Sequence, residues 1–259
     1  MRKVQPKKYL GQHFLNDARI AARIVEALPL PPYQVLEVGP GMGVLTGHLA
    51  VIPDIDLRLI EVDEESIDYL HAHFPQLSRR IISGDFLKLN LADYFKGKYS
   101  VIGNFPYNIS SQIFFKVLEN RDSVHCITGM VQREVGRRIT APPGSKEYGI
   151  LSVLMQAWYH AEYLFTVSEN VFVPPPKVKS AVVRFIRNDV QDLGCDASLF
   201  HKVVKRAFNQ RRKTLRNSLK PFGIVAEDER ANTLLKLRPE QLGVEEFVEL
   251  TLLVERSGR

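Results

Sequence analysis

The sequence predicts an α/β fold with a mostly parallel sheet, followed by a small all-helical domain. From residue 34 onward, apolar runs typical of strands alternate with amphipathic helical patterns, as in βαβ units. A glycine-rich turn joins the first run to the first helical pattern, and the pattern after about residue 188 is helical throughout. A chain of 259 residues suits one large domain with a small companion. We therefore expect two domains, residues 1–187 and residues 188–259.

Seven apolar runs account for the expected sheet. The parallel strands are expected at 34–38, 57–62, 80–83, 99–103 and 124–130, with helices at 44–50, 64–74, 110–118 and, at greater length, near 148–160. Residues 161–167 and 180–187 are predicted to form a final antiparallel pair. The proline-rich connection FVPPPKVKS joins that pair, and its prolines cannot donate hydrogen bonds to a strand, so its conformation is fixed in advance.

Charge and cysteine content narrow the classes of function. The net charge of +6 and a pI near 9.3 indicate an anionic partner, although they do not separate nucleic acid from general solubility. The two cysteines, Cys126 and Cys195, lie far apart without a CxxC pair, so no metal site is expected. Because the chain shows neither a long apolar run nor a signal-peptide core, we expect a cytoplasmic protein without a membrane partner.

The first strand runs into the glycine turn of the segment VLEVGPGMGVLT. Its spacing is Gly39-x-Gly41-x-Gly43, with Val44 at the position where a dinucleotide fingerprint needs its third glycine, which disfavours an NAD-dependent dehydrogenase. The turn instead resembles the shorter E-x-G-x-G-x-G turn of methyltransferases that use S-adenosylmethionine (SAM). A simple tight connection between strand and helix is the alternative, because glycines serve both purposes.

Two acidic residues follow the next strands. Glu61 ends the second strand about 20 residues beyond the glycines, where a carboxylate accepts ribose hydroxyls. Asp85 follows the third strand and is expected to accept from an adenine amine, and we count the adjacent Phe86 among the cofactor-binding residues. Taken alone, each residue is equally explained as a solvated carboxylate at the end of a strand. Together with Gly39 and Gly41 they predict a cofactor site at the carboxyl edge of the sheet.

The fourth strand ends in Asn104-Phe105-Pro106-Tyr107, which resembles the signature of methyltransferases acting on exocyclic amines of bases. We expect the Asn104 side-chain oxygen and the Pro106 carbonyl each to accept one N–H of the amine, which aims its lone pair at the methyl donor. Tyr107 offers a stacking face for an extruded base, and Phe105 is expected to pack inward. Phe172 is the candidate for a second stacking face, with a core position under the proline loop as the alternative.

Longer motifs carry a family resemblance over almost the whole chain. They are KKYLGQHFLND, EVGPGMGVLT, IEVD, GDFLKL, GNFPYNIS, VQREVGRRI, SKEYGILSV, VFVPPPKVKSAVVRF and LRPEQLGVEEF. The chain resembles the KsgA (RsmA) family of small-subunit rRNA adenine N6,N6-dimethyltransferases, which implies a Rossmann-like SAM-dependent methyltransferase domain. The resemblance also implies cofactor contacts from His13 and Leu15, beside Asn104. The family's usual residue at position 13 is Asn, so His13 is a departure.

The substrate follows from the resemblance alone. It implies dimethylation of two adjacent adenosines in the 3′-terminal hairpin loop of 16S rRNA, by a monomer acting on a partly assembled small ribosomal subunit during its biogenesis. Erythromycin-resistance methylases, which act on large-subunit rRNA, share the pocket, but the terminal LRPEQLGVEEF favours the first reading. A non-catalytic RNA-binding or assembly factor would have a broken cofactor site, whereas every glycine and acidic position is present here.

The segment 201–220 carries eight Lys or Arg residues and no acid. Such a surface suits RNA phosphates, and a solvated basic helix face is the alternative. The predicted RNA-binding residues are Lys202, Lys205, Arg206, Arg211, Arg212, Lys213 and Arg216, with Lys220 beside them. Further basic residues that would extend the footprint are Arg2, Lys3, Lys7 and Lys8, and Arg133, Arg137 and Arg138.

Overall fold

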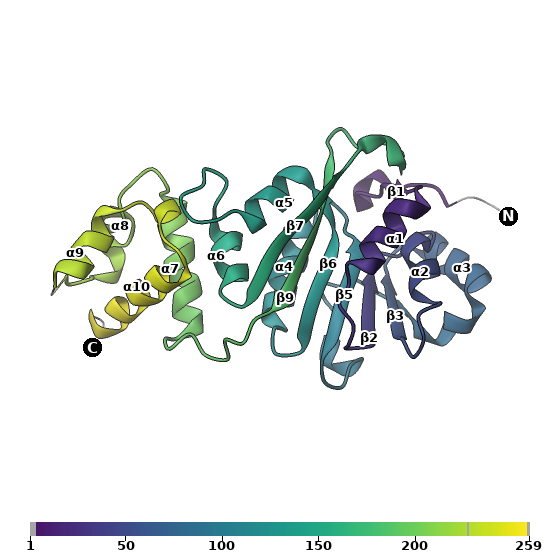
Figure 1. Ribbon diagram of the computed structural model, residues 1–259, viewed down its shortest axis with the longest axis horizontal. Helices are drawn as coiled ribbons and strands as arrows, with labels where there is room; N and C mark the ends of the chain where they lie inside the picture. Colours follow the sequence, from purple (N-terminus) through teal and green to yellow (C-terminus); the bar gives the residue numbers. More distant parts are fainter. Residues whose placement is uncertain (1–3, 227, 258–259) are drawn as a thin grey trace. The chain divides into compact units, whose positions relative to one another are not determined.

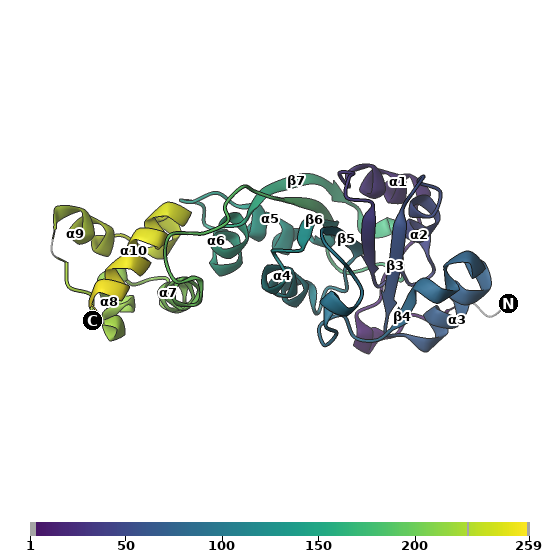
Figure 2. The same cartoon turned by 90° about the horizontal axis from the view of Figure 1, so that it is seen from below.

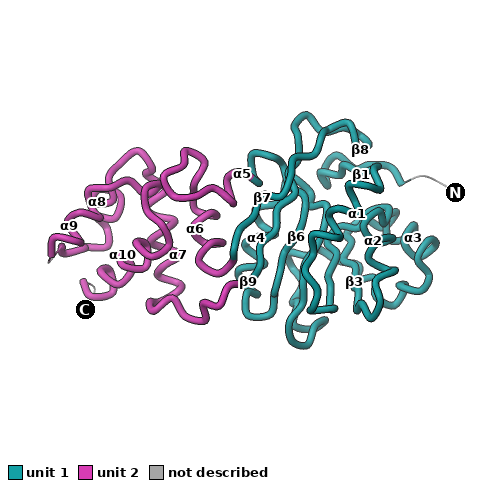
Figure 3. Tube along the Cα trace, in the orientation of Figure 1, with its two compact units in different colours: residues 1–136, 160–187 teal, residues 137–159, 188–259 magenta. Residues whose placement is uncertain are grey.

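A computed structural model describes residues 4–226 and 228–257. The chain forms two compact units, one of residues 1–136 with 160–187 and one of residues 137–159 with 188–259 (Figure 3). This division differs from the predicted domains in one respect, because residues 137–159 group with the C-terminal helices. The contacts of this segment are non-local, and no change of composition marks them in the sequence.

The first unit is built on a seven-stranded, mostly parallel sheet, as predicted (Figure 1). In spatial order its strands are β4 (Ile81–Ser83), β3 (Asp56–Glu61), β2 (Gln34–Val38), β5 (Tyr99–Asn104), β6 (Val124–Gln132), β9 (Ser180–Arg187) and β7 (Tyr159–Val167). The first five strands pair in parallel, and β9 pairs antiparallel with β6.

The strand order places a topological switch point between β2 and β5. From β2 the chain moves outward through β3 to β4, and it then returns to the other side of β2 as β5. The loops that leave β2 and β5 therefore diverge, which opens a crevice at their carboxyl ends, where open α/β sheets bind ligands. The glycine turn and Asn104 both lie at this point.

Helices cover both faces of this sheet. α1 (Ala18–Glu26) and α2 (Val44–Leu49) pack together on one face, with α3 (Glu64–His73) following β3, and α4 (Ser110–Glu119) lies on the other face (Figures 1 and 2). Helix α1 was not predicted. Its start is nonetheless encoded locally, because the Asp17 side chain accepts hydrogen bonds from the backbone N–H groups of Arg19 and Ile20.

Two further strands form a small sheet that the sequence analysis also missed. β1 (Phe14–Leu15) pairs antiparallel with β8 (Phe172–Val173), with Leu15 opposite Phe172. Strands of two residues are too short to show a hydrophobic period. Their pairing attaches the GQHFL segment to the proline-rich loop, which adds an N-terminal wall to the crevice.

The long helix predicted near residues 148–160 is wrong in its extent. The helix α6 (Ile150–Gln156) ends early, and β7 already begins at Tyr159. Trp158 and Tyr159 are large aromatic residues that pack well on a sheet, and this tertiary context decides against the helix. Helix α5 (Arg133–Thr140), directly after β6, was not predicted.

The second unit is helical, as expected for the C-terminal part of the chain. Its helices include α7 (Ala197–Asn209), α8 (Leu215–Ser218), α9 (Glu229–Lys236) and α10 (Val244–Ser257), and α7 packs against α6, α8 and α10. Short 3-10 turns occur in both units at Lys8–Leu10, Pro75–Arg80, Leu91–Asp93, Glu169–Val171, Lys220–Phe222 and Pro239–Gln241. None of the helices in the described residues is long and apolar enough to cross a membrane.

Candidate active site

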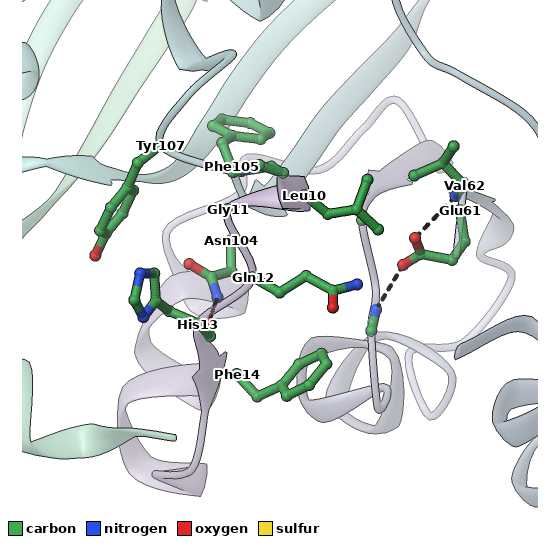
Figure 4. A pocket seen from close by; sticks show the side chains of 13 residues that line it. Leu10, Gly11, Gln12, His13, Phe14, Glu61, Val62, Asn104, Phe105 and Tyr107 are labelled. Atoms are coloured by element: carbon green, nitrogen blue, oxygen red, sulfur yellow. Dashed lines mark hydrogen bonds between the residues drawn. The ribbon is translucent and has the colours of Figure 1, made fainter. Parts of the chain in front are cut away.

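Two cavities lie at the carboxyl ends of the central strands. The larger encloses about 480 Å³ of space that opens to solvent (Figure 4). It is lined by Leu10, Gly11, Gln12, His13, Phe14, Gly39, Gly41, Glu61, Val62, Asn104, Phe105, Pro106 and Tyr107. The smaller, of about 320 Å³, shares Phe14, Gly39, Gly41 and Asn104 with it and adds Leu15 and Glu37. Most of the predicted catalytic and cofactor-binding residues thus come together at one place.

The glycine turn needs its glycines for both conformation and space. Gly39, Gly41 and Gly43 have φ angles of 67°, 56° and 76°, in the left-handed region that favours glycine. A Cβ on Gly41 would lie 2.8 Å from Cε1 of Phe14, closer than atoms can approach. The turn therefore exposes bare backbone to both cavities.

Glu61 is buried at the end of β3, with 4% of its surface exposed. Its carboxylate accepts hydrogen bonds from the backbone N–H groups of Gly41 (3.0 Å), Val62 (2.8 Å) and Asp63 (3.0 Å). Burial raises the pKa of this carboxyl above its usual value, although the three N–H donors oppose the shift. A carboxylate has about four lone pairs, so about one remains for a ligand hydroxyl. Accepting both ribose hydroxyls, as predicted, would require lone pairs to be shared.

The N-terminal segment is fastened beside Glu61 through Asp63, a contact that the sequence analysis missed. Asp63 is buried, forms an ion pair with Lys7, and accepts hydrogen bonds from Gln12 (3.2 Å) and Ser66 (2.8 Å). Burial acts to raise the pKa of Asp63, but the bonds from Lys7, Ser66 and Gln12 outweigh it and lower the pKa. Because Lys7 serves this internal ion pair, it is not a free RNA contact.

The side-chain amide of Asn104 has a fixed orientation. Its Nδ2 donates a hydrogen bond of 2.8 Å to the backbone carbonyl of His13. The oxygen of the same amide accepts no hydrogen bond from the residues that the structure describes, and it remains available in the cavity. Phe105 packs inward as predicted, with 1% of its surface exposed, and its ring lies against Gly103 and Gly129.

Pro106 and Tyr107 complete the turn after β5. The Pro106 carbonyl already accepts a hydrogen bond from the Ile109 N–H (3.2 Å), which leaves it one lone pair. The Phe105 carbonyl accepts none from the described part of the chain. Burial raises the pKa of the Tyr107 hydroxyl, which is hydrogen-bonded to Ser180, so Tyr107 stays neutral. The Tyr107 ring stacks on His13, with ring centroids 5.4 Å apart.

Three of the predicted catalytic and cofactor-binding residues lie outside the lining of both cavities. Asp85 accepts a hydrogen bond from the Leu87 N–H (3.0 Å) and pairs with Lys88, while the adjacent Phe86 is buried. Phe172 is 2% exposed and belongs to the hydrophobic core, which is the alternative that the sequence left open. Its strand register explains this placement, because Phe172 points inward beside Leu15 while Val173 is 52% exposed. Their cofactor and stacking roles stay predictions.

The basic segment separates into two groups within the second unit. Arg206 donates to the Ser218 carbonyl, Arg211 to the Lys146 carbonyl, and Arg216 to the Asn232 side chain. In contrast, the side chains of Lys202, Lys205, Arg212, Lys213 and Lys220 are exposed and form no hydrogen bond or ion pair with the described residues. Arg133, Arg137 and Arg138 belong to α5, whereas Arg2 and Lys3 lie outside the described residues. The free group is the better candidate for phosphate contacts.

Comparison with known proteins decides the family. The family model for ribosomal RNA adenine dimethylases matches residues 3–254. The chain belongs to the ribosomal RNA adenine dimethylase family. It is 59% identical over 259 residues to the ribosomal RNA small subunit methyltransferase A of Parabacteroides distasonis, covering 99% of this chain and 96% of that one. The corresponding protein of Flavobacterium johnsoniae is 54% identical over 260 residues, with 100% and 99% covered.

Solved structures show the same fold. A dimethyladenosine transferase from Plasmodium falciparum has the same fold, with a TM-score of 0.79 and 22% identity over 95% of this chain and 98% of that one. The 23S rRNA methyltransferase ErmE matches with a TM-score of 0.66 and 25% identity over 95% and 100%. This ribosomal RNA adenine dimethylase is thus a SAM-dependent methyltransferase with a Rossmann-like domain, as predicted.

Glu37 provides a test of the electrostatics beneath the adenine dimethylase site. It is 1% exposed, and the Thr46 hydroxyl donates to it at 2.7 Å. Burial raises its pKa from the usual 4.5 to about 8, with Thr46 opposing and Glu61 adding to the shift. The folded state therefore holds a proton on Glu37 that the unfolded chain releases. The contribution of this bound proton to the free energy of unfolding is complete below about pH 4.5 and is lost as the pH rises through about 8.

We expect Glu37→Gln to remove this loss of stability with rising pH, because the glutamine side chain stays neutral. Between pH 5 and pH 8, its free energy of unfolding should fall less steeply than that of the wild type, as measured by urea denaturation at a series of pH values. The exposed Glu119→Gln variant serves as the control and should follow the wild-type pH dependence. Parallel curves for the wild type and Glu37→Gln would show that Glu37 is ionised in the folded protein.

Proposed function

We propose that this protein transfers methyl groups from SAM to the N6 amines of two adjacent adenosines in the 3′-terminal hairpin loop of 16S rRNA, within a partly assembled small ribosomal subunit. The observation that carries the proposal is the Asn104 amide, whose nitrogen is bound to the His13 carbonyl so that its oxygen is left as an acceptor in the cavity. The full-length similarity to small-subunit methyltransferases supports the choice of rRNA. We expect the protein to act as a monomer in the cytoplasm, where small subunits are assembled.

The residues at the switch point fit SAM. When bound, SAM supplies an electrophilic methyl group on a sulfonium. Glu61 retains an acceptor for a ribose hydroxyl, and Gly39 and Gly41 let a ligand lie directly against the backbone. Phe14 and Asn104 line both cavities.

The turn after β5 activates the target amine. The N6 lone pair of adenine is delocalised into the ring, so the amine is a weak nucleophile. The Asn104 oxygen accepts one N–H, and a carbonyl of the turn accepts the other, which holds the amine in place and stabilises the positive charge that develops on nitrogen. Pro106 offers one remaining lone pair for this second bond, and the unoccupied Phe105 carbonyl is its competitor. No strong base is needed, because the methylated nitrogen becomes acidic and loses its proton afterwards.

Labelled SAM tests this function directly. The protein is incubated with immature small subunits that lack the methyl groups and, in parallel, with large subunits. We expect label only in the small subunits, approaching four methyl groups each at completion. Label in the large subunits would favour the second candidate, a large-subunit rRNA methylase, which the structural likeness to ErmE suggests. Label in neither would overturn both.

The free basic group should account for much of the salt dependence of RNA binding. We expect the fourfold variant Lys202→Gln, Lys205→Gln, Arg212→Gln and Lys213→Gln to lower the slope of log affinity against log salt by about 3, at about 0.7 per lost phosphate contact. Binding to small-subunit rRNA at several salt concentrations measures the slope. The matched control neutralises the exposed Arg19, Arg79, Lys96 and Arg256 and should leave the slope nearly unchanged. Equal slopes for the two variants would contradict the assignment.

A further inference from the structure

The loop of residues 141–149, between α5 and α6, carries a basic residue that was not predicted to bind RNA. This residue is Lys146, which is exposed and whose side chain forms no hydrogen bond or ion pair with the described residues. The loop and α7 both belong to the second unit (Figure 3). The surroundings of Lys146 therefore depend on how the loop is held against α7.

Arg211, which follows α7, fastens this loop through two of its backbone carbonyls. Its Nη2 donates to the carbonyls of Lys146 (2.6 Å) and Ser145 (3.4 Å). Its Nε lies 3.7 Å from a carboxylate oxygen of Glu240, and the Glu240 backbone carbonyl accepts from the Gly144 N–H (2.6 Å). The charge of Arg211 is thus compensated by Glu240, and its N–H groups are used to hold the loop.

The loop is also ordered by its own contacts. The Ser145 N–H donates to the Pro142 carbonyl (3.3 Å), and the Ser145 carbonyl accepts from the Tyr148 N–H (3.2 Å). Tyr148 is fully buried, and its ring meets the Phe208 ring of α7 edge to face, with centroids 6.2 Å apart. A lysine on a backbone fixed in this way loses less conformational freedom on binding than one on a mobile loop.

The fastened loop brings Lys146 to the cations that follow Arg211 in the chain. Arg212 and Lys213 are exposed, and their side chains are unpaired among the described residues. The loop carries one exposed acid, Glu147. Three unpaired cations against one acid leave a positive surface, which suits the phosphates of RNA.

We propose that Lys146 contacts an RNA phosphate together with Arg212 and Lys213, and that Arg211 is a positioning residue that holds Lys146 in this group. This inference rests on the proposed function. A contact of this kind neutralises a phosphate and releases its counterions, so it strengthens binding without reading the base sequence, and salt weakens it. A direct contact of Arg211 with RNA is the competing role for that residue.

Binding of the full-length protein to small-subunit rRNA at several salt concentrations tests the role of Lys146. We expect Lys146→Gln to lower the slope of log affinity against log salt by about 0.7, as for one lost phosphate contact. The matched control is Lys96→Gln, because Lys96 is also exposed on a loop and its carbonyl also accepts from a side chain, that of Gln34 (2.9 Å). The control should keep the wild-type slope. Equal slopes for Lys146→Gln and the wild type would overturn the inference.

Arg211→Lys separates positioning from direct contact, because lysine keeps the charge but lacks the planar fork that reaches two carbonyls. If Arg211 positions Lys146, this variant should lower the slope as much as Lys146→Gln does, and combining the two should lower it no further. A wild-type slope for Arg211→Lys would overturn the positioning role. So would a loss of about 0.7 for Arg211→Gln that adds fully to the loss for Lys146→Gln.

Melting temperatures and calorimetry with SAM identify a variant that fails to fold. Because Lys146 is exposed, Lys146→Gln is expected to fold, and its slope tests the inference even where an Arg211 variant does not fold. A wild type that methylates small subunits while Lys146→Gln keeps the wild-type slope sinks this inference alone. A wild type that methylates no small subunit sinks the proposed function, and this inference with it.

Discussion

Replacing Asn104 by alanine is expected to lower the rate of methyl transfer by about 100- to 1000-fold, the usual loss when a pre-organised hydrogen-bonding partner of a charged transition state is removed. The Asn104 oxygen is the acceptor that the bond from Nδ2 to the His13 carbonyl leaves facing the cavity. Single-turnover measurements at saturating SAM and saturating small subunits isolate the transfer step. Calorimetry with SAM should show a much smaller effect on cofactor affinity.

The control for this variant is Asn90→Ala. Asn90 is another side-chain amide, hydrogen-bonded to Asp93 at an exposed position, and it lines neither cavity. We expect its transfer rate to equal that of the wild type. Equal incorporation by Asn104→Ala and the wild type would remove Asn104 from the mechanism and leave the backbone carbonyls of the turn as the remaining acceptors.

Gly129→Ala should damage both stability and catalysis, although residue 129 lies in β6 and lines neither cavity. A Cβ at this position would collide with the Phe105 ring and lie 2.7 Å from the Gly103 carbonyl oxygen. Such overpacking destabilises a protein by about 1–3 kcal/mol. Because Phe105 sits between Asn104 and Pro106, displacing its ring should move both acceptors. A misplacement of about 1 Å can lower a rate by about a hundredfold. Urea denaturation and single-turnover transfer measure the two losses.

Gly47→Ala is the matched control. Gly47 lies within α2, and an added Cβ would have no neighbour within 4 Å, so we expect normal transfer and a stability gain of up to about 1 kcal/mol. Adding Phe105→Leu to Gly129→Ala should recover part of the lost stability, because the smaller side chain relieves the collision with the ring. Full activity in Gly129→Ala would show that Phe105 does not position the turn.

The site depends on residues that are far apart in the sequence but converge on one crevice. Glu61 fixes the glycine turn through Gly41, and the Asp63 ion pair with Lys7 fastens the N-terminal segment beside it. That segment then contributes His13, whose carbonyl orients Asn104. Glu61 at one end of the cavity and Asn104 at the other are therefore linked through hydrogen bonds and the backbone of residues 7–13. This arrangement explains why a substitution at one end should be tested for its effect at the other.

The sequence by itself determined the mostly parallel sheet and the residues that follow its strands. Strand patterns are local, and parallel strands bring their carboxyl ends to one edge, so Gly41, Glu61 and Asn104 were predicted together. The longer motifs also carried the family resemblance, which the match over residues 3–254 confirms.

Only the tertiary structure decided which side chains face the cavity and which are used elsewhere. The pairing of β1 with β8 turned Phe172 into the core and set His13 against Tyr107. In the basic segment, Arg211 bonds to the backbone at Lys146, while Lys202 remains free. These outcomes depend on hydrogen-bond partners and strand registers between distant segments, and neither composition nor periodicity within one segment records them.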